Sequence, residues 1–400
     1  MNRWGIAVAA VFLQIALGAV YAWSVFRDPL ARQFGWSVPQ ITLTFTIAIF
    51  VLGFASFFGG LWMNKQGPRI VAMTGGALYG IGVFLASFTS QGHLFWLYAT
   101  YGFIGGMGLG LGYIVPVAVL VKWFPDKRGL ITGIAVGGFG AGALVTAPVA
   151  SSLIRSVGVL RTFSYLGIAY LIVGVIAGSF LKNPPDGYRP KGWQPSAAVQ
   201  ATRTARDYKL GEALAAWQWW VLWLLLFINT SAGISLISQE APVFRSFAGV
   251  TAAAAAGMVG IVSLGNALGR VFWAWFSDLT TRRITFAVMY LLQVALFWFL
   301  PSIHTASLLT VIAFIILMCY GGGFGTMPAF TADYFGPKNV GPIYGLMLTS
   351  WSFASAFGPL MIAKMYQASH QYSGAFHIIA IVLLVSVVLP IIVRPPAVAR

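Results

Sequence analysis

Stretches of about 20 apolar residues, the length that an α-helix needs to cross the hydrocarbon core of a bilayer, recur along almost the whole of this 400-residue chain. Hydrophobic residues make up 59% of the chain and charged residues only 8%, whereas about a quarter of the residues in an ordinary soluble domain are charged. Most of this apolar surface must be solvated by lipid. The sequence therefore predicts an all-α polytopic membrane protein rather than a set of soluble domains.

Twelve segments fit membrane-spanning helices. They are expected near residues 4–26, 39–63, 70–90, 94–121, 129–153, 160–182, 214–238, 249–276, 284–303, 306–331, 340–366 and 372–394. The first segment continues past the length of a secretory signal and has no persuasive cleavage site, so it is expected to be the first span. An even number of spans places both ends of the chain on one side of the membrane.

The formal charge of +16 suggests nucleic acid at first, but the basic residues lie in short connectors and not along one face. With both termini placed in the cytoplasm, six Lys and Arg residues lie outside and seventeen lie inside: Arg3, Lys65, Arg69, Lys122, Lys127, Arg128, Lys182, Arg189, Lys191, Arg203, Arg206, Lys209, Arg282, Arg283, Lys338, Arg394 and Arg400. Cytoplasmic loops carry such an excess of positive charge. The sequence thus predicts a multi-pass protein of the cytoplasmic (inner) membrane that binds no nucleic acid. Arg270 alone is left inside the membrane.

The chain divides into two related halves. A polar, proline-rich segment at 183–213 is expected to be a cytoplasmic linker between a six-helix bundle at 1–182 and a second one at 214–400. Loops of similar sequence occur in the two halves about 211 to 214 positions apart, which indicates an internal duplication. Transporters built from two parallel halves place the substrate near the bilayer midplane, between those halves.

Other chemistry finds little support in the sequence. The single cysteine, Cys319, excludes an internal disulfide, and the four histidines lack the spacing of metal ligands. The glycine-rich run "GGMGLGLG" has no strand or acidic partner of a dinucleotide site, so helix packing explains it better. A membrane-embedded enzyme would need a nucleophile–base pair at membrane depth. No enzyme, cofactor or metal is expected, and a non-transporting nutrient sensor stays open as an alternative.

The segment "GLWMNKQGPR" (60–69) resembles the loop signature of the major facilitator superfamily, with Asn64 in place of the usual aspartate. Asp278 stands at the matching place in the second half. This resemblance, together with twelve spans and a central linker, implies the major facilitator fold of two pseudo-symmetric six-helix halves.

A narrower resemblance covers most of the chain. "YAWSVF" in the first span, "WFPDKRGLITGIAVGGFGAGA" entering the fifth and the arginine of the eighth are similar to the oxalate/formate antiporter family and to its relatives, the monocarboxylate (lactate) transporters. Lactate-type members carry Asp or Asn four residues before that arginine, and Asn266 stands there. The oxalate exchanger has a lysine in span eleven, where this chain has Trp351. The resemblance therefore implies a substrate with one carboxylate.

Arg270 is the strongest candidate for a binding residue. A charged side chain at membrane depth usually faces a cavity or a counter-ion, and no carboxylate lies within the predicted spans to serve as a permanent partner. A guanidinium binds a carboxylate through two hydrogen bonds. The alternative is that Arg270 extends toward Asp278, two turns away. Asn266 shares its helical face and either contacts the substrate or joins two helices.

Aromatic residues complete the candidate site. The resemblance implies a pocket lined by Tyr21, Tyr113, Phe139, Tyr320 and Phe324, although plain packing explains any single one of them nearly as well. The sequence and the resemblance together predict a secondary transporter that moves small monocarboxylates such as L-lactate with protons, by alternating access. Oxalate/formate-type anion exchange is the alternative. The relatives suggest a monomer in the lipid bilayer.

Overall fold

The computed structural model describes residues 2–190, 192, 194, 204 and 206–396. Three basic residues that the charge count placed in the cytoplasm, Lys191, Arg203 and Arg400, lie outside the described residues, as does the middle of the predicted linker at 195–203.

Within the described residues the chain is helical and contains no β-strand. The first half consists of α1 (Arg3–Gly18), a 3₁₀ turn (Ala19–Trp23), α2 (Ser24–Phe34), α3 (Val38–Gln66), α4 (Pro68–Ala86), α5 (Leu94–Leu97), a π-helical turn (Tyr98–Ile104), α6 (Gly105–Trp123), α7 (Arg128–Val157) and α8 (Val159–Ser179). The second half consists of α10 (Leu210–Ala215), α11 (Trp217–Ala248), α12 (Ala252–Leu279), α13 (Arg282–Phe299), a 3₁₀ turn (Leu300–Ser302), α14 (Ala306–Phe335), α15 (Val340–Met347), α16 (Thr349–Ser369), α17 (Ser373–Ser386) and α18 (Val388–Ile392).

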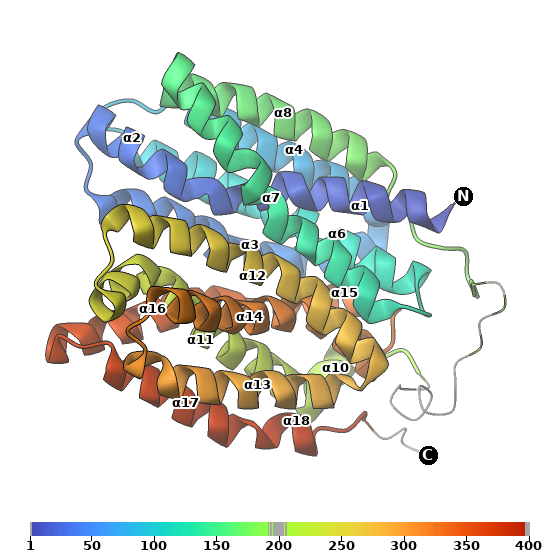
Figure 1. Cartoon of the computed structure of the whole chain (residues 1–400). Coiled ribbons are helices and arrows are strands. Elements are labelled where there is room, and N and C mark those ends of the chain that lie inside the picture. Colours follow the sequence, from blue (N-terminus) through green and yellow to red (C-terminus); the bar gives the residue numbers. More distant parts are fainter. Residues whose placement is uncertain (1, 191, 193, 195–203, 205, 397–400) are drawn as a thin grey trace.

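The described part of the chain contains twelve helical segments that are long and apolar enough to cross a membrane, which confirms the predicted number. Figure 1 shows α1 to α8 gathered on one side of the molecule and most of the later helices on the other, with both ends of the chain at the same end of the bundle. We call this the terminal end.

The first and seventh spans extend well past their predicted ends. The first continues through the 3₁₀ turn to Phe34, and the seventh extends from Trp217 to Ala248 instead of ending near 238. The second difference has a consequence for the charges in the membrane, because it places Glu240 inside a span. The seventh helical segment therefore carries a carboxyl group that lies outside its predicted bounds. Asp278 and Asp333 also fall within the last turns of α12 and α14.

Local signals set the helix boundaries. Gly35 ends α2 in the left-handed conformation with φ of +70°, which glycine adopts without steric cost. Ser37 then begins α3 with a capping box, in which its hydroxyl accepts a hydrogen bond from the Gln40 amide and its own amide donates to the Gln40 side chain.

Two glycines let α12 lie directly against α14. A Cβ atom at Gly265 would be 2.5 Å from the Phe314 carbonyl oxygen, and one at Gly269 would be 2.5 Å from the Met318 Cα. Gly265 and Gly269 form a Gly-x-x-x-Gly pair, a pattern typical of close helix packing in membranes.

We expect Gly269→Ala to lower the free energy of unfolding by about 1–3 kcal/mol, because the added methyl group overlaps the α14 backbone. Gly257 lies on the same helix with open space around it, so Gly257→Ala is the matched control and should be neutral or slightly stabilising. Thermal unfolding of the purified protein in detergent measures both. Equal melting temperatures for the two variants would contradict the close packing.

The two halves meet closely at the terminal end. There α7 packs along α12 and α14, and α3 packs along α15. A Cβ at Gly133 in α7 would be 2.5 Å from the Arg270 carbonyl oxygen, and one at Gly60 in α3 would be 2.6 Å from the Pro342 nitrogen. Farther toward the other end of α12, Gly257 and Gly260 have open space around them. The halves are thus in contact at the terminal end in this conformation.

Candidate functional site

Arg270 lies on α12 with its side chain completely buried. Its Nε donates to the Asn266 amide oxygen at 3.3 Å, its Nη1 to the Val136 carbonyl at 3.2 Å and its Nη2 to the Tyr21 hydroxyl at 3.4 Å. All three acceptors are neutral. They orient the guanidinium but leave its charge without an anion.

Arg270 makes no ion pair with any described residue. Asp278 is occupied elsewhere: it accepts hydrogen bonds from the backbone amides of Gly129 and Leu130 and pairs with Arg282 at 2.7 Å. The alternative in which Arg270 extends to Asp278 is therefore wrong for this conformation. Arg270 instead turns across the interface between the halves, toward the first-half elements that carry Tyr21 and Val136.

Glycines in α7 and α14 bring the backbone close to Arg270. A Cβ at Gly140 would lie 3.2 Å from the Arg270 Nε, and one at Gly325 would lie 2.9 Å from the Arg270 carbonyl carbon. This contact explains part of the run "GGFGAG" at 137–142, which supplies small residues where α7 crosses α12. The buried arginine is thus held between one helix of the first half and two of the second.

Aromatic rings surround the guanidinium. The Arg270 Cζ lies 5.3 Å from the ring centroid of Phe324 and 5.9 Å from those of Tyr21 and Phe139. Tyr113 makes an edge contact with Phe139 at 5.1 Å, and Tyr320 makes one with Phe324 at 5.3 Å. All seven residues that the sequence singled out therefore lie in one connected cluster.

Trp351 packs against these rings. From the sequence it was identified only as the residue that replaces a lysine of the oxalate exchanger. Its centroid lies 4.6 Å from Phe324, 6.0 Å from Tyr113 and 6.1 Å from Phe139, and its side chain is 1% exposed. It also lies 6.5 Å from Tyr21. The signal in the sequence was its position in "LTSWSFAS", but only the fold shows that it contacts four members of the cluster.

The hydroxyls of Tyr113 and Tyr344 were also not predicted as a pair. Both are buried, and among the described residues neither makes a hydrogen bond of 3.5 Å or less. A buried hydroxyl without a partner is costly unless water or a ligand satisfies it. The Tyr113 and Tyr344 hydroxyls interact with each other only beyond that distance, so the cluster holds a cation and the Tyr113 hydroxyl beside large apolar rings. We call the seven predicted residues and Trp351 the arginine cluster.

The arginine cluster is closed in most directions. Arg270, Tyr113, Phe139, Tyr320, Phe324 and Trp351 are buried, whereas Tyr21 and Asn266 are half-buried. Asn266 lies one turn from Arg270 in the direction away from the terminal end. The only partly exposed members of the cluster are therefore Tyr21 and Asn266.

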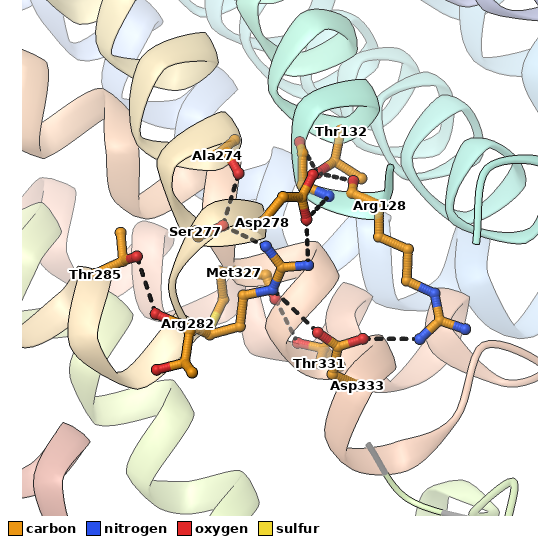
Figure 2. A network of polar contacts seen from close by, with 12 residues as sticks. Arg128, Thr132, Ala274, Ser277, Asp278, Arg282, Thr285, Met327, Thr331 and Asp333 are labelled. Carbon is orange, nitrogen blue, oxygen red and sulfur yellow. Dashed lines mark hydrogen bonds and ion pairs between the residues drawn. The ribbon is translucent and has the colours of Figure 1, made fainter. Parts of the chain in front are cut away.

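A second polar cluster closes the terminal end, and Figure 2 shows it. Arg128 of α7 pairs with Asp333 of α14 at 2.8 Å, and Arg282 of α13 pairs with the same carboxylate at 3.0 Å. Arg282 also binds Asp278 and the Ser277 hydroxyl. These charges are largely buried, and we call Arg128, Asp278, Arg282 and Asp333 the interface ion network.

Asp278 caps a helix of the opposite half. Residue Lys127 at the start of α7 offers no side-chain cap, so the first amides of that helix have no partner within it. Asp278 supplies the acceptors, with distances of 3.0 Å to the Gly129 nitrogen and 2.8 Å to the Leu130 nitrogen. A carboxylate at a helix N-terminus is also favoured by the helix dipole.

The related loop of the first half carries no such charge. Asn64, which replaces the usual aspartate of the loop signature, donates from its amide to the Asn339 side chain at 3.0 Å. Asn64 is exposed and Asn339 is half-buried. The terminal end is therefore closed by a charged contact on one side and a neutral amide pair on the other.

A hollow of about 1060 Å³ opens at the terminal end, but it does not contain the arginine cluster. Its lining includes Asn64, Lys122, Arg128, Lys338 and Asn339, which belong to the loops and helix ends of that face. Arg128 belongs both to this lining and to the interface ion network. The hollow is therefore a surface feature of the closed end.

Comparisons with known proteins agree with this architecture. Residues 4–359 and 249–400 match the family model of the Major Facilitator Superfamily. The chain is 29% identical over 398 residues to the oxalate:formate antiporter of Oxalobacter formigenes, across 98% of this chain and 92% of that protein. It is 26% identical over 413 residues to monocarboxylate transporter 2 of Rattus norvegicus, across 96% and 81% of the two chains.

A solved structure has the same fold. The crystal structure of the transporter FucP in the outward conformation aligns with a TM-score of 0.72 at 16% identity, across 96% of this chain and 97% of that one. The family match extends over nearly the whole sequence and the twelve spans are in place. This chain belongs to the major facilitator superfamily.

Proposed function

We propose that the protein is a proton-coupled symporter of small monocarboxylates such as L-lactate and pyruvate-like acids. The observation that carries the proposal is the buried Arg270 guanidinium, which has neutral hydrogen-bond partners and no ion pair within the described chain. A carboxylate would supply the missing charge and bind the planar fork through two hydrogen bonds. Both the oxalate:formate antiporter and the monocarboxylate transporter among the relatives are named for small carboxylates.

Substrate binding favours the conformational change for an electrostatic reason. An unneutralised guanidinium is costly in a cavity that closes and excludes water, since transfer of a charge to a low-dielectric site is unfavourable. An anion that binds Arg270 removes part of that cost, so the loaded protein changes conformation more readily than the empty one. The halves then separate at the terminal end and close at the other.

The rings around Arg270 suit a short carbon chain. Phe139, Phe324 and Trp351 offer apolar surface, and Asn266 and Tyr21 offer polar atoms beside the guanidinium. One cation matches one carboxylate. With Trp351 where the oxalate exchanger resembled by this sequence carries lysine, the cluster favours a monoanion over a dianion.

The second candidate is anion exchange, which the 29% identity to the oxalate:formate antiporter favours. Purified protein in proteoliposomes distinguishes the two. Symport predicts that an inward proton gradient drives accumulation of radiolabelled L-lactate into vesicles without internal anion. Uptake that occurs only into vesicles preloaded with formate or oxalate would show exchange instead.

Restoring a lysine tests the choice of substrate. We expect Trp351→Lys to make oxalate at least about tenfold more effective as an inhibitor of L-lactate uptake, because a second cation would face the second carboxylate. Trp351→Phe is the control for the lost ring volume and should leave oxalate inhibition as in the parent. Equal inhibition by oxalate in all three proteins would contradict the role given to this position.

In this proposal the protein acts in the cytoplasmic membrane with the terminal end inside the cell. The excess of basic residues on that side supports the orientation. We propose transport rather than catalysis, because the guanidinium, amide and rings of the arginine cluster can bind and release an anion. The proposed unit is the single chain.

A further inference from the structure

Glu240 is a buried carboxyl group that the arginine cluster does not use. It lies on α11, inside the seventh span, and is 4% exposed. Neither of its oxygens takes part in a hydrogen bond or ion pair among the described residues, and its Oε1 is fully enclosed. A carboxyl group in such surroundings is far less costly as the neutral acid than as the anion.

The face of α11 that bears Glu240 leads to the arginine cluster. Asn229, Gly233, Leu236 and Glu240 follow helical spacing and are all buried on one side of the helix. A Cβ at Gly233 would be 2.6 Å from the Tyr320 ring, and Asn229 donates to the Tyr320 carbonyl at 3.1 Å. Glu240 is two helical turns beyond Gly233, about 10 Å along the axis, on the side away from the terminal end.

In the described part of the chain, no basic group forms an ion pair with Glu240. On its own helix the nearest one is Arg245, which is exposed. The helices that pack against α11 include α12, α14, α16 and α17. Apart from those near the terminal end, their charged or titratable side chains are Arg270, Cys319, Tyr320, Lys364, Tyr366 and His377. Lys364 and Tyr366 are exposed, and His377 packs against Trp298. Beyond the helix ends, Tyr372 donates to Gln239 and His304 binds the Phe247 carbonyl.

The backbone next to Glu240 is weakened. Pro242 lies inside α11 and has no amide hydrogen for the Ser238 carbonyl, so one helical hydrogen bond is missing beside the carboxyl group. A helix bends most easily at such a place. Pro242 therefore marks the place on α11 where a bend beside Glu240 needs the fewest backbone hydrogen bonds to break.

We propose that Glu240 is the proton-binding residue of the transporter, a role that rests on the proposed symport. In water-exposed form its carboxylate takes up one proton as the O–H bond forms. Buried in the form seen here, it is the neutral acid and adds no charge as the halves move. On exposure to the other side the O–H bond breaks and the proton returns to water. One proton and one monoanion then cross together, so no net charge crosses the membrane.

This assignment separates two activities. Net symport requires Glu240 to release its proton in each cycle before the empty protein returns. Exchange of internal for external L-lactate needs no release, because the protein moves back and forth with substrate bound and the carboxyl group protonated. A glutamine, which resembles the neutral acid but cannot ionise, therefore supports exchange and not accumulation.

The experiment uses the full chain in proteoliposomes. A pH difference of about one unit, acid outside, supports about a tenfold accumulation of radiolabelled L-lactate by a one-proton symporter. For Glu240→Gln we expect no accumulation above that of protein-free vesicles, while exchange against internal unlabelled L-lactate without a gradient stays within about threefold of the parent. Glu240→Asp, which can ionise, should still accumulate.

Glu212 is the matched control, since it is the only other glutamate of the sequence and its side chain is 44% exposed. Glu212→Gln should accumulate and exchange like the parent. Accumulation by Glu240→Gln at the parental level would overturn the assignment, as would the loss of exchange in a Glu240→Gln variant with a parental melting temperature. If that variant does not fold, Glu240→Asp decides, because a pH profile of uptake identical to the parent's would contradict the role. Failure of the parent itself to respond to the gradient would overturn the symport, not the choice of residue.

Discussion

Arg270→Gln is expected to lower kcat/KM for L-lactate uptake by at least about 30-fold, because loss of one partner from a buried, hydrogen-bonded charge pair costs about 2–5 kcal/mol. The glutamine keeps a polar side chain, but it is shorter than arginine and brings no positive charge. Arg270→Lys keeps the charge and loses the planar fork, so we expect an intermediate loss of about tenfold.

Uptake by purified protein in proteoliposomes measures this effect, with a melting curve for each variant to establish folding. Arg32→Gln, at an exposed position on α2, is the matched control and should transport like the parent. Parental uptake by a folded Arg270→Gln variant would show that the buried charge has a structural role only.

Asp333→Asn is expected to favour separation of the halves at the terminal end. Asp333 pairs with Arg128 from the first half and Arg282 from the second, and its carboxylate is 6% exposed. Removal of one partner from a buried ion pair costs about 3–5 kcal/mol, since the remaining charge is left without compensation. Arg282 still has Asp278, whereas Arg128 loses its ion pair with Asp333, which joins it to the second half.

Cross-linking measures that change. The Asn64 Nδ2 and the Asn339 Oδ1 lie 3.0 Å apart across the halves, so Asn64→Cys with Asn339→Cys, in a Cys319→Ser background, should be joined readily by a short thiol-reactive cross-linker. We expect Asp333→Asn to slow cross-linking at least about tenfold. Asp28→Asn is the control, because the Arg27–Asp28 pair is exposed and such pairs contribute little. An unchanged cross-linking rate in a folded Asp333→Asn variant would contradict the closing role of the network.

The sequence predicted the number of spans because each carries its own signal in about 20 apolar residues. It failed where a span continues past its apolar part. The composition expected at a helix end occurs at Ser238, Gln239, Glu240 and Pro242. Helix α11 nevertheless continues to Ala248, because its buried face packs against other helices of the second half. The first span likewise continues through Arg27 and Pro29 to Phe34.

The sequence likewise predicted only part of the arginine cluster. Arg270 stands out in any hydropathy profile, and Asn266 follows from helical spacing. The aromatic residues were identified by resemblance to a family, since nothing in their local sequence distinguishes a pocket ring from a packed one. Trp351 and Tyr344 could be placed beside Tyr113 only from the fold, because both are more than 200 residues away from Tyr113 in the sequence.

Titration of the purified protein with L-lactate and with its neutral amide tests most directly whether Arg270 binds the substrate carboxylate. The two compounds have nearly the same shape and differ in charge. We expect calorimetry to detect binding of L-lactate to the parent, and neither lactamide with the parent nor L-lactate with folded Arg270→Gln to give a comparable affinity. Equal affinity of the parent for L-lactate and lactamide, or of parent and variant for L-lactate, would contradict it.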